Sequence, residues 1–233
     1  MLHARELKFA DAAALTVALA DDITHCLRAA IASRGTASLV VSGGRTPVAL
    51  FNRLATAVLD WRQVTVVLAD ERWVDGAAAT SNERLVRDEL LREQAAVARL
   101  VGLKSAVASA AAGAPLASQR IAQVARPFDC VLLGMGDDGH TASLFPASPL
   151  LEQALDGTQA PACVAMQAPV APFERLSLNL AALLDARRIV LHIQGATKWT
   201  VYETAQGTGA TSEMPIRAVL RQSRVPVEVY WSP

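Results

Sequence analysis

The stretch Ser38–Pro47, SLVVSGGRTP, holds the pattern that decides the fold class. Its apolar run is unbroken rather than alternating, which is typical of a strand buried on both faces in a parallel sheet covered by helices. Two glycines follow, and then Thr46 and Pro47, which suit the N-cap and the first position of a helix. The stretch therefore predicts a strand, a glycine turn and a helix in succession.

Further apolar runs continue this pattern along the chain. They are Val64–Leu68, Cys130–Leu133, Arg188–Ile193 and, after Pro226, Val227–Trp231. One more segment, Leu176–Leu180, alternates polar and apolar residues, which predicts a half-exposed or edge strand.

Helices are expected between the strands. The predicted segments are Pro47–Val58, Ser81–Leu91 and Pro115–Ala125. Thr80 and Glu83 have the spacing of a capping box for the second of these. Near the start of the chain, apolar residues recur in steps of four from Leu15 to Ile31, which predicts a long helix with Asp11 as its N-cap. This periodicity speaks against a signal peptide, because it continues past any cleavage point.

Strands and helices in alternation predict one α/β domain over residues 1–233. Its sheet would be Rossmann-like and mostly parallel, with some antiparallel additions and with helices flanking it. The sequence contains no internal repeat, low-complexity linker or shift in composition that would mark a domain boundary.

The amino-acid composition argues against several classes of protein. The 233 residues carry 22 basic and 22 acidic side chains, which argues against a nucleic-acid binder or a polybasic membrane-surface protein. Hydrophobic residues make up 52% of the chain, enough to exclude disorder. No apolar run reaches the roughly 18 residues of a transmembrane helix. The 3 cysteines show no zinc or disulfide spacing, so we expect reduced thiols in a cytoplasmic protein.

Polar motifs follow the predicted strands directly, and in such folds ligands bind at the carboxyl ends of the strands. In Ser42–Pro47, two glycines allow successive backbone N–H groups to point at a ligand, and the start of a helix favours phosphate. An ordinary strand-to-helix turn is the alternative, and the ending of a Walker motif is absent. Asp70, Glu71 and Arg72 could position sugar hydroxyls and a phosphate, or form a surface salt-bridge cluster.

The segment Gly134–Pro146 reads GMGDDGHTASLFP and carries the strongest chemical signal. It formally contains G-x-G-x-x-G, but it lies halfway along the chain and Pro146 interrupts the helix that should follow, so nicotinamide binding is not expected. His140 stands among two aspartates, which suits general acid–base chemistry. Asp137, Asp138 and His140 could together bind a metal ion, but no second ligand cluster has suitable spacing, and we expect no metal.

The remaining histidines are weaker candidates for catalysis, and two basic residues are candidates for binding a phosphate. His3 lies near the terminus, His25 falls in the first helix, and His192 is more typical of a packed strand residue than of a catalyst. No Gly-x-Ser-x-Gly elbow of a serine hydrolase occurs. Arg175 opens the alternating segment and Lys198 follows a strand into a helix, so both could reach the same sheet edge and clamp a phosphate.

Together these motifs resemble the 6-phosphogluconolactonase family, whose relatives include glucosamine-6-phosphate deaminase. The motifs are SGGRTP, DERWV followed by Ser81-Asn82, GMGDDGHTASLFP, Arg175 and GATK, in order across residues 42–198. The resemblance implies a modified Rossmann-like sheet of the deaminase and ribose-5-phosphate isomerase type, and no cofactor. It implies hydrolysis of 6-phosphogluconolactone, the second step of the oxidative pentose phosphate pathway. Two departures are small: Asp137 occupies a variable position, and Ala147 stands where many relatives have glycine.

The resemblance also implies roles for individual residues. His140 would deprotonate the attacking water, and Asp70 would lie near the sugar or orient the histidine. The residues around the 6-phosphate would be Ser42, Gly43, Gly44, Thr46, Arg72, Arg175 and Lys198. A δ-lactone is an activated ester, so water and one base suffice, and backbone N–H groups of the glycine-rich loops could stabilise the oxyanion.

Two other functions remain as alternatives. Glucosamine-6-phosphate deaminases share Asp-Gly-His but continue with Asn-Glu-Pro where this chain reads Ser143–Pro146, so an acidic group needed for isomerisation is missing. A non-catalytic sugar-phosphate-sensing domain would have lost the histidine or carried a DNA-binding domain. We therefore expect a lactone-hydrolysing enzyme with a small-molecule substrate and no nucleic-acid or membrane partner.

Overall fold

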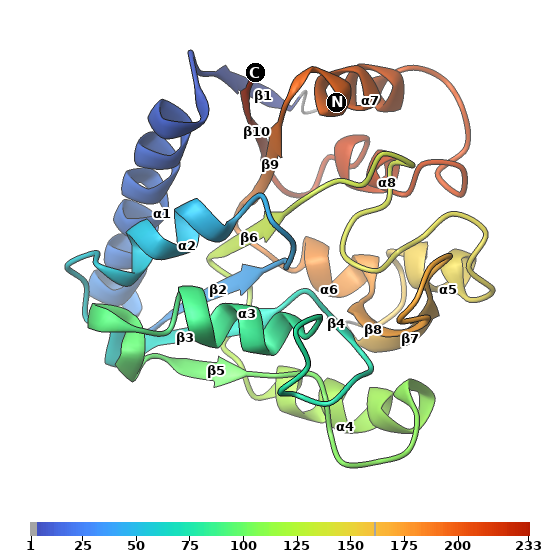
Figure 1. Ribbon diagram of the computed structural model, residues 1–233, viewed down its shortest axis with the longest axis horizontal. Coiled ribbons are helices and arrows are strands. Elements are labelled where there is room, and N and C mark those ends of the chain that lie inside the picture. Colours follow the sequence, from blue (N-terminus) through green and yellow to red (C-terminus); the bar gives the residue numbers. More distant parts are fainter. Residues whose placement is uncertain (1–3, 161) are drawn as a thin grey trace.

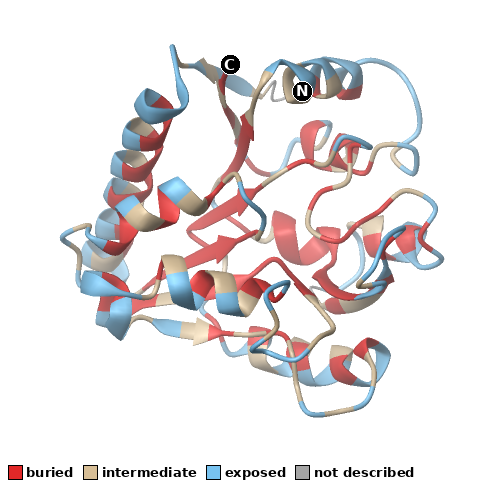
Figure 2. Cartoon of the chain, viewed as in Figure 1, coloured by how far each residue is buried: buried red, intermediate tan, exposed pale blue. Residues whose placement is uncertain are grey.

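The computed structural model describes residues 4–160 and 162–233, and a seven-stranded parallel sheet forms its centre (Figure 1). Across the sheet, the strands are β1 (Arg5–Lys8), β10 (Val227–Ser232), β9 (Ile189–Gln194), β6 (Cys130–Leu133), β2 (Ala37–Val41), β3 (Val64–Leu68) and β5 (Arg99–Val101). The central strands are buried along almost their whole length (Figure 2), as unbroken apolar runs require. The predicted α/β class with a mostly parallel sheet is confirmed.

Helices cover the sheet and connect its strands. They are α1 (Ala12–Arg34), α2 (Val48–Ala55), α3 (Asn82–Glu89), α4 (Ala110–Ala122), α5 (Leu151–Leu155), α6 (Leu180–Leu184), α7 (Ala196–Gln206) and α8 (Ile216–Leu220), with 3₁₀ turns at Trp61–Gln63 and Glu93–Val97. The helix α1 begins as predicted, because the Asp11 side chain accepts a hydrogen bond from the Ala14 N–H at 2.8 Å. It packs against α2 and against β2, β6 and β10, with its apolar residues at steps of four facing the sheet.

A smaller antiparallel sheet lies beside the large one, in the order β4 (Asp70–Arg72), β8 (Glu174–Leu178) and β7 (Cys163–Gln167). The expectation of a half-exposed or edge strand at Leu176–Leu180 is wrong. β8 is the middle strand, and α4 packs against it, so even Ser177 is buried, with its hydroxyl hydrogen-bonded to the backbone of Leu178 and Ser143. Leu180 instead begins α6 after the N-cap Asn179.

Some predicted helix starts are also wrong. The helix α3 is capped by Ser81, which accepts from the Arg84 N–H at 3.2 Å, and not by a Thr80 capping box. Thr46 forms no side-chain cap on α2. The helix α4 begins at Ala110 and runs through Pro115, because the Ser109 hydroxyl accepts from the first turn and fixes an earlier start. Within the two described ranges, no helix has both the length and the apolar character needed to span a membrane.

Candidate active site

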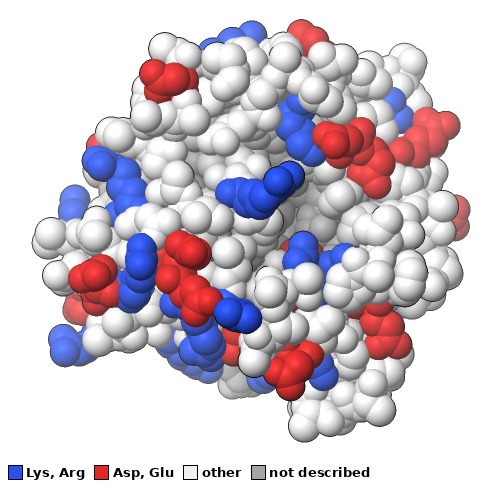
Figure 3. All heavy atoms as spheres, viewed as in Figure 1, with Lys and Arg blue, Asp and Glu red and all other residues white. Residues whose placement is uncertain are grey.

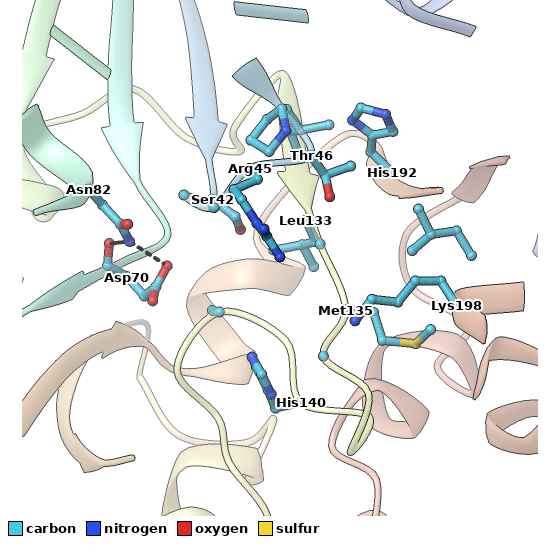
Figure 4. Close-up of a pocket in the computed structure, with 18 of the residues that line it drawn as sticks. Ser42, Arg45, Thr46, Asp70, Asn82, Leu133, Met135, His140, His192 and Lys198 are labelled. Atoms are coloured by element: carbon cyan, nitrogen blue, oxygen red, sulfur yellow. Dashed lines mark hydrogen bonds between the residues drawn. The ribbon is translucent and has the colours of Figure 1, made fainter. Parts of the chain in front are cut away.

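A cavity of about 310 Å³ opens where β2, β3, β6 and β9 end (Figure 4). β2 and β6 are neighbours at the point where the strand order reverses, which is where open α/β sheets bind ligands. The loops after all four strands contribute to the lining, and the labelled side chains are Ser42, Arg45, Thr46, Asp70, Asn82, Leu133, Met135, His140, His192 and Lys198. The polar motifs that follow these four strands in the sequence therefore lie around one cavity.

The loop after β2 presents its backbone to the cavity. None of the N–H groups of residues 43–46 donates a hydrogen bond to another group in the described structure. Gly44 has a φ of 102°, which favours glycine. A Cβ on Gly43 would lie 1.9 Å from Oδ1 of Asn82, so close approach requires glycine there as well. Successive unpaired N–H groups next to a helix form an anion-binding site.

Basic side chains gather around a hollow on this face of the molecule (Figure 3). Arg45, Arg72 and Lys198 line the cavity. Arg45 is exposed and forms no ion pair with any other described residue. Arg72 donates to the Thr80 carbonyl at 2.6 Å, while its buried Nε has no partner. Lys198 pairs with Asp137 at 2.7 Å.

Arg175 lies outside the lining of the cavity. It is the cross-strand partner of Arg72 in the β4–β8 pair, and it is buried with an unpartnered Nε. Burial, together with repulsion from Arg72, lowers the pKa of Arg175. Two neighbouring guanidinium groups without a salt bridge among the described residues create a positive field that an anion would relieve.

Asp70 connects two loops of the site. Its carboxylate accepts from the Ser143 hydroxyl at 2.6 Å and from the Asn82 amide at 3.2 Å. It lines the cavity, as predicted, but no hydrogen bond joins it to His140. Orientation of the histidine by Asp70 does not fit this geometry, and its place near the sugar stays a prediction.

Glu71 has a supporting position that the sequence did not indicate. It is fully buried, and burial raises the pKa of its carboxyl, although hydrogen bonds from the backbone N–H groups of Arg72, Asn82 and Glu83 partly offset the effect. The Ser81 hydroxyl also donates to this carboxylate. A strand residue thus holds the first turn of α3, which places Asn82 against Gly43 and Asp70. The surface salt-bridge alternative for this motif does not hold for Glu71.

His140 is oriented by Asp138. The distance from Nδ1 to Oδ1 of Asp138 is 2.5 Å, and the same oxygen accepts from the His140 backbone N–H at 3.0 Å. Partial burial opposes ionisation of Asp138, but the hydrogen bonds from His140 outweigh it, and the pKa of Asp138 is lowered. In the neutral form of the imidazole, an ionised Asp138 favours the proton on Nδ1, which leaves Nε2 as an acceptor. The ring of Phe145 lies 4.4 Å away, and a Cβ on Gly136 would collide with the imidazole at 2.1 Å.

The other histidines lie apart from this arrangement. His192 is in the cavity wall but is buried, and burial lowers its pKa to about 4, so it is neutral at physiological pH. His25 is exposed on α1, and His3 lies outside the described residues. Asp137 turns to Lys198 rather than to His140, and no group of three or more metal-ligating side chains occurs in residues 4–160 and 162–233.

Residues 10–231 match the family described as glucosamine-6-phosphate isomerases/6-phosphogluconolactonase. The chain belongs to this family. A 6-phosphogluconolactonase of Rhizobium meliloti is 49% identical over 225 residues, covering 97% of each chain. One of Pseudomonas putida is 46% identical over 226 residues, covering 97% of this chain and 92% of the other. The crystal structure of a 6-phosphogluconolactonase from Shewanella baltica has a TM-score of 0.96 at 47% identity, with 99% and 98% covered.

For this member of the family, the structure adds site residues whose contacts the sequence did not indicate. Asn82 bridges the Gly43 loop and Asp70, Arg45 extends over the cavity in Figure 4, and Asp138 holds the histidine. Asp138 lies two residues before His140, so its contact could have been read from the short loop. The position of Asn82 depends on the packing of α3 and has no local signal.

The departure at Ala147 has a structural consequence. This residue has a φ of 59°, which costs an L-amino acid about 1–2 kcal/mol. Glycine removes that strain but increases the entropy of the unfolded chain by about 0.4–1 kcal/mol. We expect Ala147→Gly to stabilise the protein by about 0.5 kcal/mol and to raise Tm by about 1–2 °C in a calorimetric scan.

The matched control is Ala49→Gly on the exposed face of α2, where glycine should lower stability by about 0.5–1 kcal/mol. A lower Tm for Ala147→Gly would show that its backbone is not strained.

Proposed function

We propose that the chain hydrolyses 6-phosphoglucono-1,5-lactone to 6-phosphogluconate, the second step of the oxidative pentose phosphate pathway. The observation that carries this proposal is the free Nε2 of His140, held by Asp138 in a cavity that also presents unpaired N–H groups and three basic side chains. A general base on one side of the cavity and an anion-binding loop on the other suit a substrate that carries both a neutral ester and a phosphate group. The names of the most similar relatives support the same substrate.

In the proposed reaction, Nε2 of His140 accepts a proton from water as the oxygen attacks the lactone carbonyl carbon. The carbonyl oxygen becomes an oxyanion, which backbone N–H groups of the glycine-rich loops stabilise. The tetrahedral intermediate then breaks the bond between this carbon and the ring oxygen. The imidazolium returns its proton to the departing oxygen, and Asp138 stabilises the cation while it exists.

The phosphate group would occupy the basic side of the cavity. Its proposed contacts are Ser42, Gly43, Gly44, Thr46, Arg72 and Lys198, with Arg175 supplying charge from beside Arg72. The buried hydroxyl of Ser42 has no partner within the described structure and is free to donate to such a group. This set places the phosphate near helix α2 and leaves the space next to His140 for the lactone ring.

We also propose a cellular compartment and a domain organisation for the enzyme. We place the enzyme in the cytoplasm as one catalytic domain over residues 1–233, acting on a small molecule without nucleic-acid or membrane partners. Cys26, Cys130 and Cys163 are free thiols, in keeping with a reducing compartment. The balanced charge agrees with a small-molecule substrate.

The decisive experiment is acid release from freshly generated 6-phosphogluconolactone, followed with a pH indicator and compared with unphosphorylated gluconolactone. We expect rapid release from the phosphorylated lactone and a far slower reaction with the other. Equal rates would contradict the phosphate site. Ammonia release from glucosamine 6-phosphate would favour a deaminase, and binding without turnover of either substrate would favour a sensing domain.

Asp138→Asn tests whether the charge of the Asp138 carboxylate assists catalysis by His140. Asparagine can still accept from Nδ1–H, but it removes the charge that stabilises the imidazolium, so kcat should fall by about 10–100-fold. KM should change little, because Asp138 contacts His140 and does not line the cavity. Steady-state kinetics measures both values, and an unchanged kcat would show that the ion pair does not contribute to proton transfer.

A further inference from the structure

Lys198 and Asp137 form an ion pair at the mouth of the cavity. Lys198 is in the first turn of α7, and Asp137 is in the loop after β6, so the pair joins two segments that flank the site. The distance from Nζ to Oδ1 is 2.7 Å, with the Lys198 side chain 26% exposed and that of Asp137 74% exposed. Among the described residues, Arg45 and Arg72 also line the cavity but have no carboxylate partner.

We propose that Asp137 sets the affinity of the cavity for phosphate by competing with it for Lys198. This inference rests on the proposed function. A phosphate that approaches Nζ must displace the Asp137 carboxylate or accept its repulsion at short range. Asp137 therefore weakens binding of every ligand that carries this phosphate, the product included.

Two adjacent carboxylates thus act at different ends of the site. Asp138 contacts His140, whereas Asp137 contacts Lys198 and makes no hydrogen bond to any other described side chain. Because Asp137 is mostly exposed and holds no loop backbone, its replacement removes charge without removing structural support. Its effect should appear in phosphate binding and not in the chemical step.

The direct test is isothermal titration of Asp137→Asn with inorganic phosphate and with 6-phosphogluconate. We expect Kd for both ligands to fall by about fivefold to tenfold, because one negative charge near the bound dianion is removed in a water-like dielectric. KM for the phosphorylated lactone should fall similarly, while kcat should not rise. The charge-matched control is Glu152→Gln on α5, an exposed residue that does not line the cavity, and it should leave Kd unchanged. Unchanged Kd values in Asp137→Asn, or equal tightening in Glu152→Gln, would overturn the proposal.

A double-mutant cycle tests whether Lys198 is the group for which Asp137 and phosphate compete. In a Lys198→Gln background, Asp137→Asn should change Kd for phosphate by less than about twofold, because the competition no longer exists. Tightening that persists would indicate a general field rather than competition for Lys198, and would overturn the proposal. Asp137→Glu keeps the carboxylate on a longer side chain, so phosphate should bind about as weakly as it does to the wild-type protein.

The binding measurements need no turnover. If wild-type protein binds phosphate but releases no acid from the lactone, the proposed function fails while the role of Asp137 is still decided by the titrations.

Discussion

Replacing His140 with alanine is expected to lower kcat for 6-phosphogluconolactone by about 10²–10⁴-fold, the usual effect of losing a general base. The loss should appear in kcat more than in KM, because the imidazole acts in the transition state and the phosphate contacts remain. The protein should stay folded and still bind 6-phosphogluconate. The imidazole is partly exposed, and its contacts are with Asp138 and Phe145 at the surface of the loop.

The matched control is His192→Ala. That side chain is buried in β9, so its removal should lower Tm more than it lowers kcat. Initial rates of acid release, with thermal scans of both variants, provide the comparison. A His140→Ala protein that keeps more than about a third of wild-type kcat would exclude this residue as the base, given the expected magnitude.

The second large effect concerns recognition of the phosphate. Lys198→Ala and Arg72→Ala should each raise KM for the phosphorylated lactone by about 10–150-fold, because each removes a charge-assisted hydrogen bond of ~1.5–3 kcal/mol. The reaction of unphosphorylated gluconolactone should change by no more than a few-fold. The quantity to measure is the ratio of kcat/KM for the two lactones in each variant.

The structure offers a close control in Arg84→Ala. Arg84 donates to the Ala77 carbonyl as Arg72 donates to the Thr80 carbonyl, but it does not line the cavity. Loss of a surface contact of this kind is worth about 0–1 kcal/mol and should affect both lactones alike. A ratio that stays at the wild-type value in both cavity variants would show that these residues do not recognise the phosphate.

Local sequence patterns were sufficient for most of the large sheet and for the location of the candidate site. Unbroken apolar runs at β2, β3, β6 and β9 predicted buried strands, because a strand covered on both faces needs apolar residues at every position. His140 could be singled out because a polar glycine-rich loop directly after such a strand must lie at the carboxyl edge. The start of α1 was also predictable, since an N-cap acts within one turn.

Contacts between distant segments could not be predicted from the sequence. Alternation at Leu176–Leu180 suggested exposure, but α4 and two neighbouring strands bury the segment. Ser81 caps α3 in place of Thr80, and the carboxylate of Glu71, from a separate strand, accepts hydrogen bonds from the first turn of the helix. Arg175 lies beside Arg72 because the antiparallel register of β4 and β8 pairs the two residues.

The sequence by itself thus determined the α/β class, the positions of the main strands along the chain and the family resemblance carried by the motifs that follow those strands. Only the tertiary structure decided that Asp70 joins Ser143 and Asn82 and that Asp137 pairs with Lys198. The physical reason is the range of the interactions. Burial patterns and caps act over one strand or one turn, whereas these polar pairs form only after the crossover connections bring the ends of separate strands together.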